Sequence, residues 1–432
     1  MQFASLFFYK MFKLNPSLEI HKHKENYYLK VNSELKLTTN EELLALKIIA
    51  ENLDPLEIAR KFQIKPKIIL WFLKRAFDRN LIIKSEPLIK RDPIKFPLKI
   101  KEYKNDFLEP EVFNVQWHIT NRCDLNCKHC YDRTSRKELS MEKLEKIMEK
   151  IFKFCFKYSL WPQITFTGGN PFLHKSFFKL YEKADEMGFT LGILGNPVSE
   201  EKLKRIVEIK KPSFYQISLE GLKSYNDFIR GKGHFKKSID FLKLLKRYGI
   251  YSNVMLTLNK KNINEVFDLI PTINSFTDSI TFNRLALIGE GKNLEMVDKK
   301  EFMNFLHKYV EFAKKNQKIR LKENLINIVL YKEYNEVFGG CTNFGCGAAF
   351  NFVAILPDGE VHACRKFHSY IGNVYREDFE TIYFSEEAEK YRKPPQECLN
   401  CPINRVCRGC LAVTDSLKIN FSYFKDPFCF LY

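Results

Sequence analysis

The middle of the chain, from about residue 113 to 318, alternates between two hydrophobic patterns. Strand-like stretches are separated by segments whose apolar residues recur at helical spacing, such as 140–158 and 234–248. The strand-like stretches are FNVQWHIT (from 113), ITFTGG (164), TLGILGN (190), FYQISLEG (214), YSNVMLTL (251) and SITFNRLAL (279). Six such strand–helix units predict an α/β fold with a parallel sheet, a partial (β/α)6 TIM-like barrel, with ligands at the carboxyl ends of the strands.

The first hundred residues follow a different pattern. Residues 27–38 alternate like a β-hairpin, and three helices are predicted over 41–52, 54–62 and 65–80. The linker SEPLIKRDPIKFPLK that follows contains three prolines, which interrupt regular structure. From about residue 335 onward, glycine, cysteine and short runs dominate. We therefore expect three domains: a small α+β domain over 1–105, the strand–helix core over 106–318 and a cysteine-rich domain over 319–432.

Composition excludes two broad classes. With 432 residues and 45% hydrophobic content, the chain can bury several cores and is not intrinsically disordered. No apolar run reaches the ~18 residues that a membrane helix needs. The apolar opening, residues 1–17, is interrupted by Lys10 and lacks a signal-peptide cleavage site, so we expect a cytoplasmic protein. The formal net charge of +18 fits either a lysine-rich solvated surface or attraction to an acidic partner such as a peptide or nucleic acid.

Cysteine changes the picture, because the chain has twelve and they are bunched. In a reducing cytoplasm such bunching indicates metal binding rather than disulfides. Cys155 is the exception: it continues the apolar face of the predicted helix over 140–158, and we assign it to the core. The other eleven are candidate metal ligands: Cys123, Cys127, Cys130, Cys341, Cys346, Cys364, Cys398, Cys401, Cys407, Cys410 and Cys429.

The triplet Cys123, Cys127 and Cys130 has C-x3-C-x2-C spacing and directly follows the first core strand. Three thiolates on a 4Fe-4S cluster leave one iron without a protein ligand. The stretch CDLNCKHCY in this setting resembles the cluster loop of radical S-adenosylmethionine (SAM) enzymes. The resemblance implies that SAM chelates the open iron and that electron transfer from the cluster cleaves SAM. The resulting 5'-deoxyadenosyl radical would abstract hydrogen from a substrate. It also implies a low-potential electron donor such as ferredoxin or flavodoxin.

The same resemblance assigns cofactor-binding residues at successive strand ends. TGGNP stands where the family has a glycine-glycine-glutamate turn that meets the methionine amino group, and Asn170 replaces the glutamate, which weakens the acceptor. Ser218 and Arg230 match a pair that binds the SAM carboxylate, Arg providing a planar fork. Taken singly, these residues could equally form a turn, a helix cap or a solvated charge. The residues assigned are Gly168, Gly169, Asn170, Asn196, Ser218 and Arg230.

The C-terminal cysteines resemble a SPASM extension, which carries two auxiliary 4Fe-4S clusters. By this resemblance one cluster is held by Cys341, Cys346, Cys364 and Cys410, and the other by Cys398, Cys401, Cys407 and Cys429. The C-x2-C spacing from Cys407 to Cys410 is one residue shorter than usual. The alternative is a zinc ribbon made by Cys398, Cys401, Cys407 and Cys410, whose paired spacing suits tetrahedral zinc.

Substrate class rests on the first domain. A hairpin followed by three helices resembles the PqqD-like peptide-recognition domain, in which a leader peptide adds a strand to a sheet edge. A winged helix and a plain packing domain remain open alternatives. Our hypothesis is a radical SAM maturase that modifies a side chain of a ribosomally made peptide or protein, with no membrane partner and no nucleic acid. The alternatives are an anaerobic sulfatase-maturating type of enzyme and, in another class, an iron–sulfur redox-sensing DNA-binding regulator.

Overall fold

The computed structural model describes residues 12–23 and 26–432, so part of the apolar opening lies outside the described residues. Its centre is a nine-stranded sheet in the order β11-β10-β9-β8-β7-β6-β12-β13-β14. The six predicted strands are present and pair in parallel, in chain order. They are β6 (Val112–Thr120), β7 (Trp161–Gly168), β8 (Thr190–Leu194), β9 (Phe214–Ser218), β10 (Ser252–Leu258) and β11 (Ser279–Arg284). The α/β fold class is therefore confirmed.

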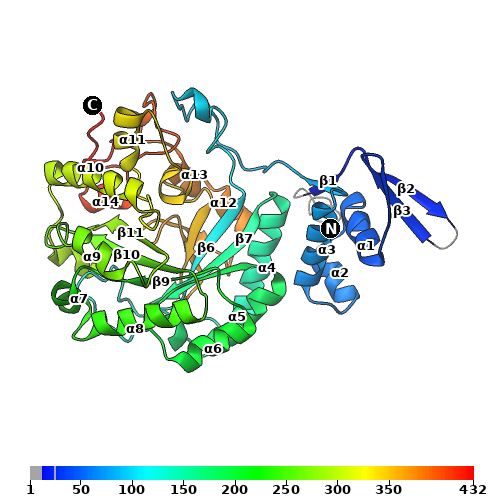
Figure 1. Ribbon diagram of the computed structural model, residues 1–432, viewed down its shortest axis with the longest axis horizontal. Helices are drawn as coiled ribbons and strands as arrows, with labels where there is room; N and C mark the ends of the chain where they lie inside the picture. The colour runs from blue at the N-terminus through cyan, green and yellow to red at the C-terminus, as the bar shows by residue number, and fades with distance from the viewer. Residues whose placement is uncertain (1–11, 24–25) are drawn as a thin grey trace.

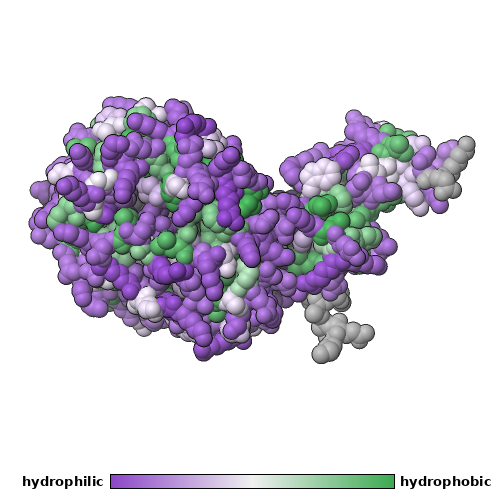
Figure 2. All heavy atoms as spheres, turned by 90° about the horizontal axis from the view of Figure 1, so that it is seen from below, coloured by the Kyte–Doolittle hydropathy of each residue, from purple (hydrophilic) through white to green (hydrophobic). Residues whose placement is uncertain are grey.

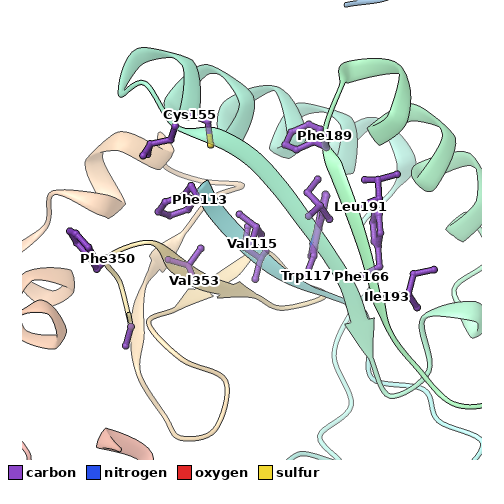
Figure 3. Close-up of a cluster of buried hydrophobic side chains, with 14 of the residues drawn as sticks. Phe113, Val115, Trp117, Cys155, Phe166, Phe189, Leu191, Ile193, Phe350 and Val353 are labelled. Carbon is purple, nitrogen blue, oxygen red and sulfur yellow. The ribbon is translucent and has the colours of Figure 1, made fainter. Parts of the chain in front are cut away.

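Helices pack on one face of these strands because alternate strand residues are large and apolar (Figure 1). Three residues of β6 are fully buried: Phe113, Val115 and Trp117. The ring of Phe113 packs edge to face on that of Phe154, in the helix over residues 141–157, with 5.3 Å between the ring centroids. Figure 3 shows these side chains filling the space between sheet and helices, with Cys155 among them. The helices are α4 (Met141–Lys157), α5 (Phe177–Met187), α6 (Glu200–Ile209), α7 (Lys223–Arg230), α8 (His234–Arg247), α9 (Val266–Ile273) and α10 (Lys299–Lys315).

The C-terminal region continues this sheet instead of forming a detached unit. Its strands are β12 (Phe352–Ile355), β13 (Glu360–His362) and β14 (Tyr370–Asn373). Strand β12 pairs in parallel with β6, and β13 and β14 follow as an antiparallel extension. Four short helices complete the region: α11 (Ile326–Tyr334), α12 (Phe379–Tyr383), α13 (Glu386–Arg392) and α14 (Leu411–Ser416). The C-terminal region is thus hydrogen-bonded, through β12, to the strand that precedes the cysteine triplet.

The N-terminal region lies to one side of the sheet (Figure 1). Its three predicted helices are α1 (Asn40–Ala50), α2 (Pro55–Lys61) and α3 (Pro66–Asp78). Thr39 and Glu42 form a reciprocal capping box at α1, and proline occupies the first position of the other two helices. The predicted hairpin is β3 (Asn26–Val31) with β4 (Glu34–Leu37), and β2 (Glu19–His23) adds a third antiparallel strand. Strands β1 (Phe12–Leu14) and β5 (Ile82–Lys84) form a separate pair.

Two sets of contacts hold the N-terminal region and the linker in place. Helix α3 packs on α5, where Lys67 Nζ lies 2.5 Å from Asp185 Oδ2 and Lys65 Nζ lies 2.7 Å from Glu186 Oε1. The linker after β5 runs instead onto the C-terminal region, where the Lys99 amide donates to the Pro402 carbonyl at 2.9 Å. The proline-rich linker is therefore part of the packed structure.

Among the described helices, none has both the length and the apolar content required to cross a bilayer.

Candidate functional site

The cysteine triplet occupies the loop after β6, at the edge where the parallel strands end. Cys123 is exposed and Cys127 and Cys130 are half-buried, and all three are free thiols. The Cys130 amide donates to the Cys127 carbonyl at 3.1 Å, which turns the loop back on itself. Burial raises the pKa of Cys123 and Cys127, and the nearby Cys130 thiol contributes to both rises. Such a crowded set is stabilised when a positively charged metal group replaces the thiol protons.

Gly168 and Gly169 hold this loop against the end of β7. The Gly169 amide donates to the Thr120 carbonyl at 2.9 Å. A Cβ on Gly168 would lie 2.1 Å from the Thr120 oxygen, and one on Gly169 would lie 2.3 Å from the Arg122 oxygen. Glycine is needed here because no side chain fits between the two strand ends. The close approach is to Thr120 at the end of β6 and to Arg122 of the cysteine loop; the expected approach of these glycines to the cofactor stays a prediction.

Asn170 and Asn196 converge on a residue that sequence analysis missed, Asp124. Both side-chain amides donate to Asp124 Oδ1, at 3.0 Å from Asn170 and 2.6 Å from Asn196. The other end of Asn170 accepts from the Phe172 amide at 3.2 Å, so this buried side chain is fully engaged within the protein. Asp124 directly follows Cys123 and is exposed, so its carboxylate gives this end of the triplet a negative charge.

Arg230 lies at the other end of the triplet and pairs with Glu220. Its Nη2 lies 2.6 Å from Glu220 Oε1, and its Nη1 lies 3.8 Å from the Cys127 sulfur. His129 Nε2 also lies 2.9 Å from Glu220 Oε1. Burial alone would raise the pKa of Glu220, but His129 and Arg230 together lower it to about 2. Ser218 is the last residue of β9 and is half-buried, two positions before this carboxylate.

The C-terminal cysteines separate into two sets in space. In the first, burial raises the pKa of Cys364 to about 12, with further contributions from Cys346 and Cys410. Cys341 has Cys346 as its thiol neighbour. We call Cys341, Cys346, Cys364 and Cys410 the first thiol group.

The second set lines one pocket between η5 (Gln396–Cys398) and the C-terminal segment. Burial raises the pKa of Cys398 to about 12, and Cys401 and Cys429 contribute to the rise. We call Cys398, Cys401, Cys407 and Cys429 the second thiol group.

These positions bear on the zinc alternative. A zinc ribbon requires its four sulfurs to converge on one ion at about 2.3 Å. Cys429 lines the pocket with Cys398, Cys401 and Cys407, while Cys410 lies near Cys364. Across residues 12–23 and 26–432, no three His, Cys, Asp or Glu side chains are arranged to hold a single metal ion. The pocket thus groups Cys429, and not Cys410, with Cys398, Cys401 and Cys407.

Two further features complete the description. Cys155 lies in the core on α4, away from both thiol groups, and burial raises its pKa. Asp124, His129 and Glu220 were missed by sequence analysis although each lies inside a quoted motif, CDLNCKHC or SLEG. Their position in these motifs was the available signal.

Comparison with known proteins yields matches over these same regions. The Radical SAM superfamily model matches residues 117–271, and the SPASM model, an iron-sulfur cluster-binding domain, matches residues 346–411. The chain is 25% identical over 328 residues to the antilisterial bacteriocin subtilosin biosynthesis protein AlbA of Bacillus subtilis (strain 168), which covers 71% of this chain and 68% of AlbA.

Two further similarities extend over most of the chain. Fe-coproporphyrin III synthase of Methanosarcina barkeri (strain Fusaro / DSM 804) is 27% identical over 380 residues, covering 79% of this chain and 92% of that protein. The crystal structure of Streptococcus suis SuiB bound to precursor peptide SuiA aligns with a TM-score of 0.61 at 18% identity, covering 97% of this chain and 100% of that chain. This structural likeness includes the N-terminal region as well as the sheet and its C-terminal extension.

Proposed function

We propose that this chain, a radical SAM enzyme with a C-terminal SPASM domain, modifies a side chain of a ribosomally made peptide or protein. Its cofactors are a 4Fe-4S cluster with SAM and auxiliary iron–sulfur clusters. Two similar proteins support the peptide substrate: AlbA is named for biosynthesis of a bacteriocin, and SuiB has been crystallised with a precursor peptide. The likeness to Fe-coproporphyrin III synthase makes a tetrapyrrole the competing substrate.

We assign the ligands from the three thiol sets. Cys123, Cys127 and Cys130 would hold the SAM cluster, and the first and second thiol groups would hold one auxiliary 4Fe-4S cluster each. When bound, the SAM cluster and SAM together supply a 5'-deoxyadenosyl radical for hydrogen abstraction. Support for the two auxiliary clusters comes from the thiols themselves, because each group offers four sulfurs and the described structure shows no disulfide among them.

The charges around the triplet match the methionine end of SAM. Asp124, held by Asn170 and Asn196, places a carboxylate beside Cys123 where an ammonium can bind. The guanidinium of Arg230 stands beside Cys127 and can attract a carboxylate, with Ser218 nearby as a hydroxyl donor. Glu220 Oε1 accepts from Nε and Nη2 of Arg230, so we assign Glu220 the role of orienting the guanidinium.

The auxiliary clusters would serve electron removal. Four thiolates saturate a 4Fe-4S cluster, so neither auxiliary cluster has an open iron for substrate. A cluster of this kind can accept the electron that a substrate radical loses when it becomes a closed-shell product. We therefore propose a net oxidative reaction, supplied with its initiating electron by a low-potential donor of the ferredoxin or flavodoxin class.

Peptide recognition is assigned to the sheet of β2, β3 and β4. Both β2 and β4 are edge strands with every residue exposed, so their outer backbone groups are open for pairing. Large apolar side chains are exposed on them, among them Ile20, Leu35 and Leu37, and Figure 2 shows apolar surface over this end of the molecule. The register places Ile20 on the face of Leu29, and Leu35 and Leu37 on the opposite face with their partners Lys30 and Tyr28. An extended peptide could add a strand to either edge, beside Ile20 on β2 or beside Leu35 and Leu37 on β4. These open edges carry the peptide assignment.

The test uses candidate precursor peptides, chosen from the short reading frames that neighbour this gene. Full-length enzyme, Leu35→Lys/Leu37→Lys on β4 and Ile20→Lys on β2 are compared for binding of the fluorescent peptide by anisotropy and for product by mass spectrometry. A substitution on the correct edge should weaken binding at least tenfold while SAM cleavage without peptide is unchanged. Unchanged binding in both variants would remove the sheet from peptide recognition. Sequence-preferring binding of duplex DNA, or turnover of an iron coproporphyrin instead of peptide, would replace the proposal.

A further inference from the structure

Arg408 occupies an unusual position between the two auxiliary sites. It follows Cys407 of the second thiol group and precedes Gly409 and Cys410, so the chain crosses from one group to the other at this residue. Its backbone has a φ of 78°, in the left-handed region that residues with a side chain rarely adopt. Its side chain is nevertheless among the largest that are fully buried. A buried cation is therefore held here in a strained backbone conformation.

The partners of this guanidinium are neutral. Arg408 Nη1 donates to the carbonyls of Arg392 at 2.7 Å and Lys393 at 3.1 Å, and Nη2 donates to the carbonyl of Cys346. Its Nε has no hydrogen-bond partner among the described residues. In the described part of the chain no carboxylate lies within 4.0 Å of Arg408, in contrast to buried Arg284, which pairs with Glu323 and Asp426.

Both thiol groups lie beside this charge. Arg408 lines the pocket of the second group together with Cys398 and Cys407, and its Nη2 donates to the carbonyl of Cys346 in the first group. Burying an unpaired cation is costly, so some negative charge must compensate it in the functional protein. Four thiolates around an oxidised core of charge about +2 carry a net charge of about −2, so each proposed auxiliary cluster would supply that compensation.

We infer that Arg408 is a shared counter-charge that raises the reduction potentials of both auxiliary clusters. One-electron reduction makes each cluster more negative, so a nearby buried cation stabilises the reduced form more than the oxidised form. Both clusters thereby become better electron acceptors for the oxidative step. This inference rests on the proposed ligand sets and adds a residue that sets their redox behaviour.

The test is a redox titration of the reconstituted protein, followed by electron paramagnetic resonance, with Arg408→Gln and Arg408→Lys. Gln removes the charge, so at a fixed potential the reduced-to-oxidised ratio of both clusters should fall about tenfold, equal to about 59 mV for a one-electron couple. Lys retains the charge, so both potentials should stay closer to wild type than to the Gln variant. Unchanged potentials in Arg408→Gln would overturn the inference, and a shift of one cluster alone would overturn the sharing.

Two neighbouring arginines supply matched variants. Arg405 is also buried and donates to backbone carbonyls, including those of Phe96 and Lys104, but its charged neighbour is Asp106 and not a thiol. In protein that has retained its iron, Arg405→Gln should therefore leave the potentials of both auxiliary clusters unchanged. Arg91 faces Cys346, so Arg91→Gln should lower the potential of the first-group cluster alone.

These variants keep the inference testable if Arg408→Gln does not fold. An equal effect of Arg405→Gln on both clusters, or no effect of Arg91→Gln, would overturn the electrostatic explanation. Iron and zinc are counted on the same samples. Four irons with one zinc in the wild-type protein would refute the ligand assignment in the proposed function. A full complement of iron in Arg408→Gln, with potentials equal to those of wild type, would refute only the role of Arg408.

Discussion

At the scale of single residues, the site is organised by charge. Asp124 and Arg230 stand beside Cys123 and Cys127, so a carboxylate and a guanidinium flank the triplet. Both are held by other side chains: two amides fix the carboxylate, and Glu220 fixes the guanidinium. A ligand that is itself a zwitterion, such as the methionine end of SAM, can meet both groups at once. The surrounding buried residues therefore orient the Asp124 carboxylate and the Arg230 guanidinium.

Glu220 gives the first prediction at this scale. Glu220→Gln removes the carboxylate and leaves Arg230 buried without its partner, which should cost about 3 to 5 kcal/mol of stability and weaken SAM binding. The change is measured by anaerobic thermal denaturation and by equilibrium dialysis of SAM against the iron-loaded protein. Lys236→Gln, which removes an exposed ion pair with Asp240, serves as the control and should change neither quantity.

The same carboxylate fixes the direction of a pH effect. Because its folded pKa of about 2 lies below the ordinary value of 4.5, ionised Glu220 stabilises the fold above about pH 4.5. That contribution is lost only as the pH falls from there towards 2. The stability difference between wild-type and Glu220→Gln proteins should therefore shrink as the pH falls from about 4.5 towards 2, which denaturant unfolding at a series of pH values would measure. A difference that stays the same over that acid range would show that Glu220 does not carry this contribution.

Cys155 provides the second prediction, since it separates packing from ligation. Cys155→Ala should leave the iron content unchanged and lower stability by about 1 kcal/mol, because it removes one buried atom from the core. Cys398→Ala should instead lose up to four of about twelve irons, the content of three 4Fe-4S clusters. Iron analysis with protein quantification decides between them. Loss of iron from Cys155→Ala alone would mean that a ligand has been misassigned.

At the scale of elements, the parallel strands were predictable because their signal is local. Each of β6 to β11 is an apolar stretch between helical segments, and the sheet follows from that alternation. Strand β2, with the sequence EIHKH, gave no such signal because every residue is exposed. Pairing of β12 with β6 was also unpredictable, since it joins residues more than 200 positions apart. For the site, the sequence motifs pointed to candidate residues. The hydrogen-bond partners of those residues, Asp124 and Glu220, were not predictable, because they depend on which strand ends lie next to each other in space.

Gly169 yields a prediction about how two elements meet. Gly169→Ala would place a Cβ 2.3 Å from the Arg122 oxygen, so the end of β7 must move away from the cysteine loop. We expect weaker SAM binding and partial loss of the SAM cluster, with the auxiliary clusters retained. Gly231→Ala is the control: its φ of 106° disfavours alanine, which is not the case at Gly169, and a Cβ there meets nothing within 4 Å. Losses in Gly231→Ala as large as those in Gly169→Ala would show that backbone change near the site, and not the contact with the loop, is responsible.

At the scale of the whole molecule, the linker joins three regions. After β5 it leaves the N-terminal helices, and residues 91–106 then pack on the C-terminal region. Arg91 donates to the carbonyl of Cys346 at 3.1 Å, and Arg405 donates to carbonyls of Phe96, Tyr103, Lys104 and Asp106. The expected boundary at residue 105 stays a prediction, but these contacts lead us to propose that the recognition unit ends near residue 84.

Two truncations test that arrangement. Removal of residues 1–84 takes away the sheet and helices of the N-terminal region but keeps the linker on the C-terminal region, so the protein should retain its full iron content and cleave SAM without substrate. Binding of the full-length precursor should fall sharply, because the open strand edges are gone.

Removal of residues 1–105 also strips the carbonyls that Arg405 binds and the Arg91 side chain beside Cys346, so iron should be lost from the C-terminal region. Iron analysis, 5'-deoxyadenosine release and peptide anisotropy distinguish the two proteins. Equal iron in both would show that the linker is dispensable for the auxiliary sites, and undiminished precursor binding after removal of 1–84 would place peptide recognition elsewhere in the molecule.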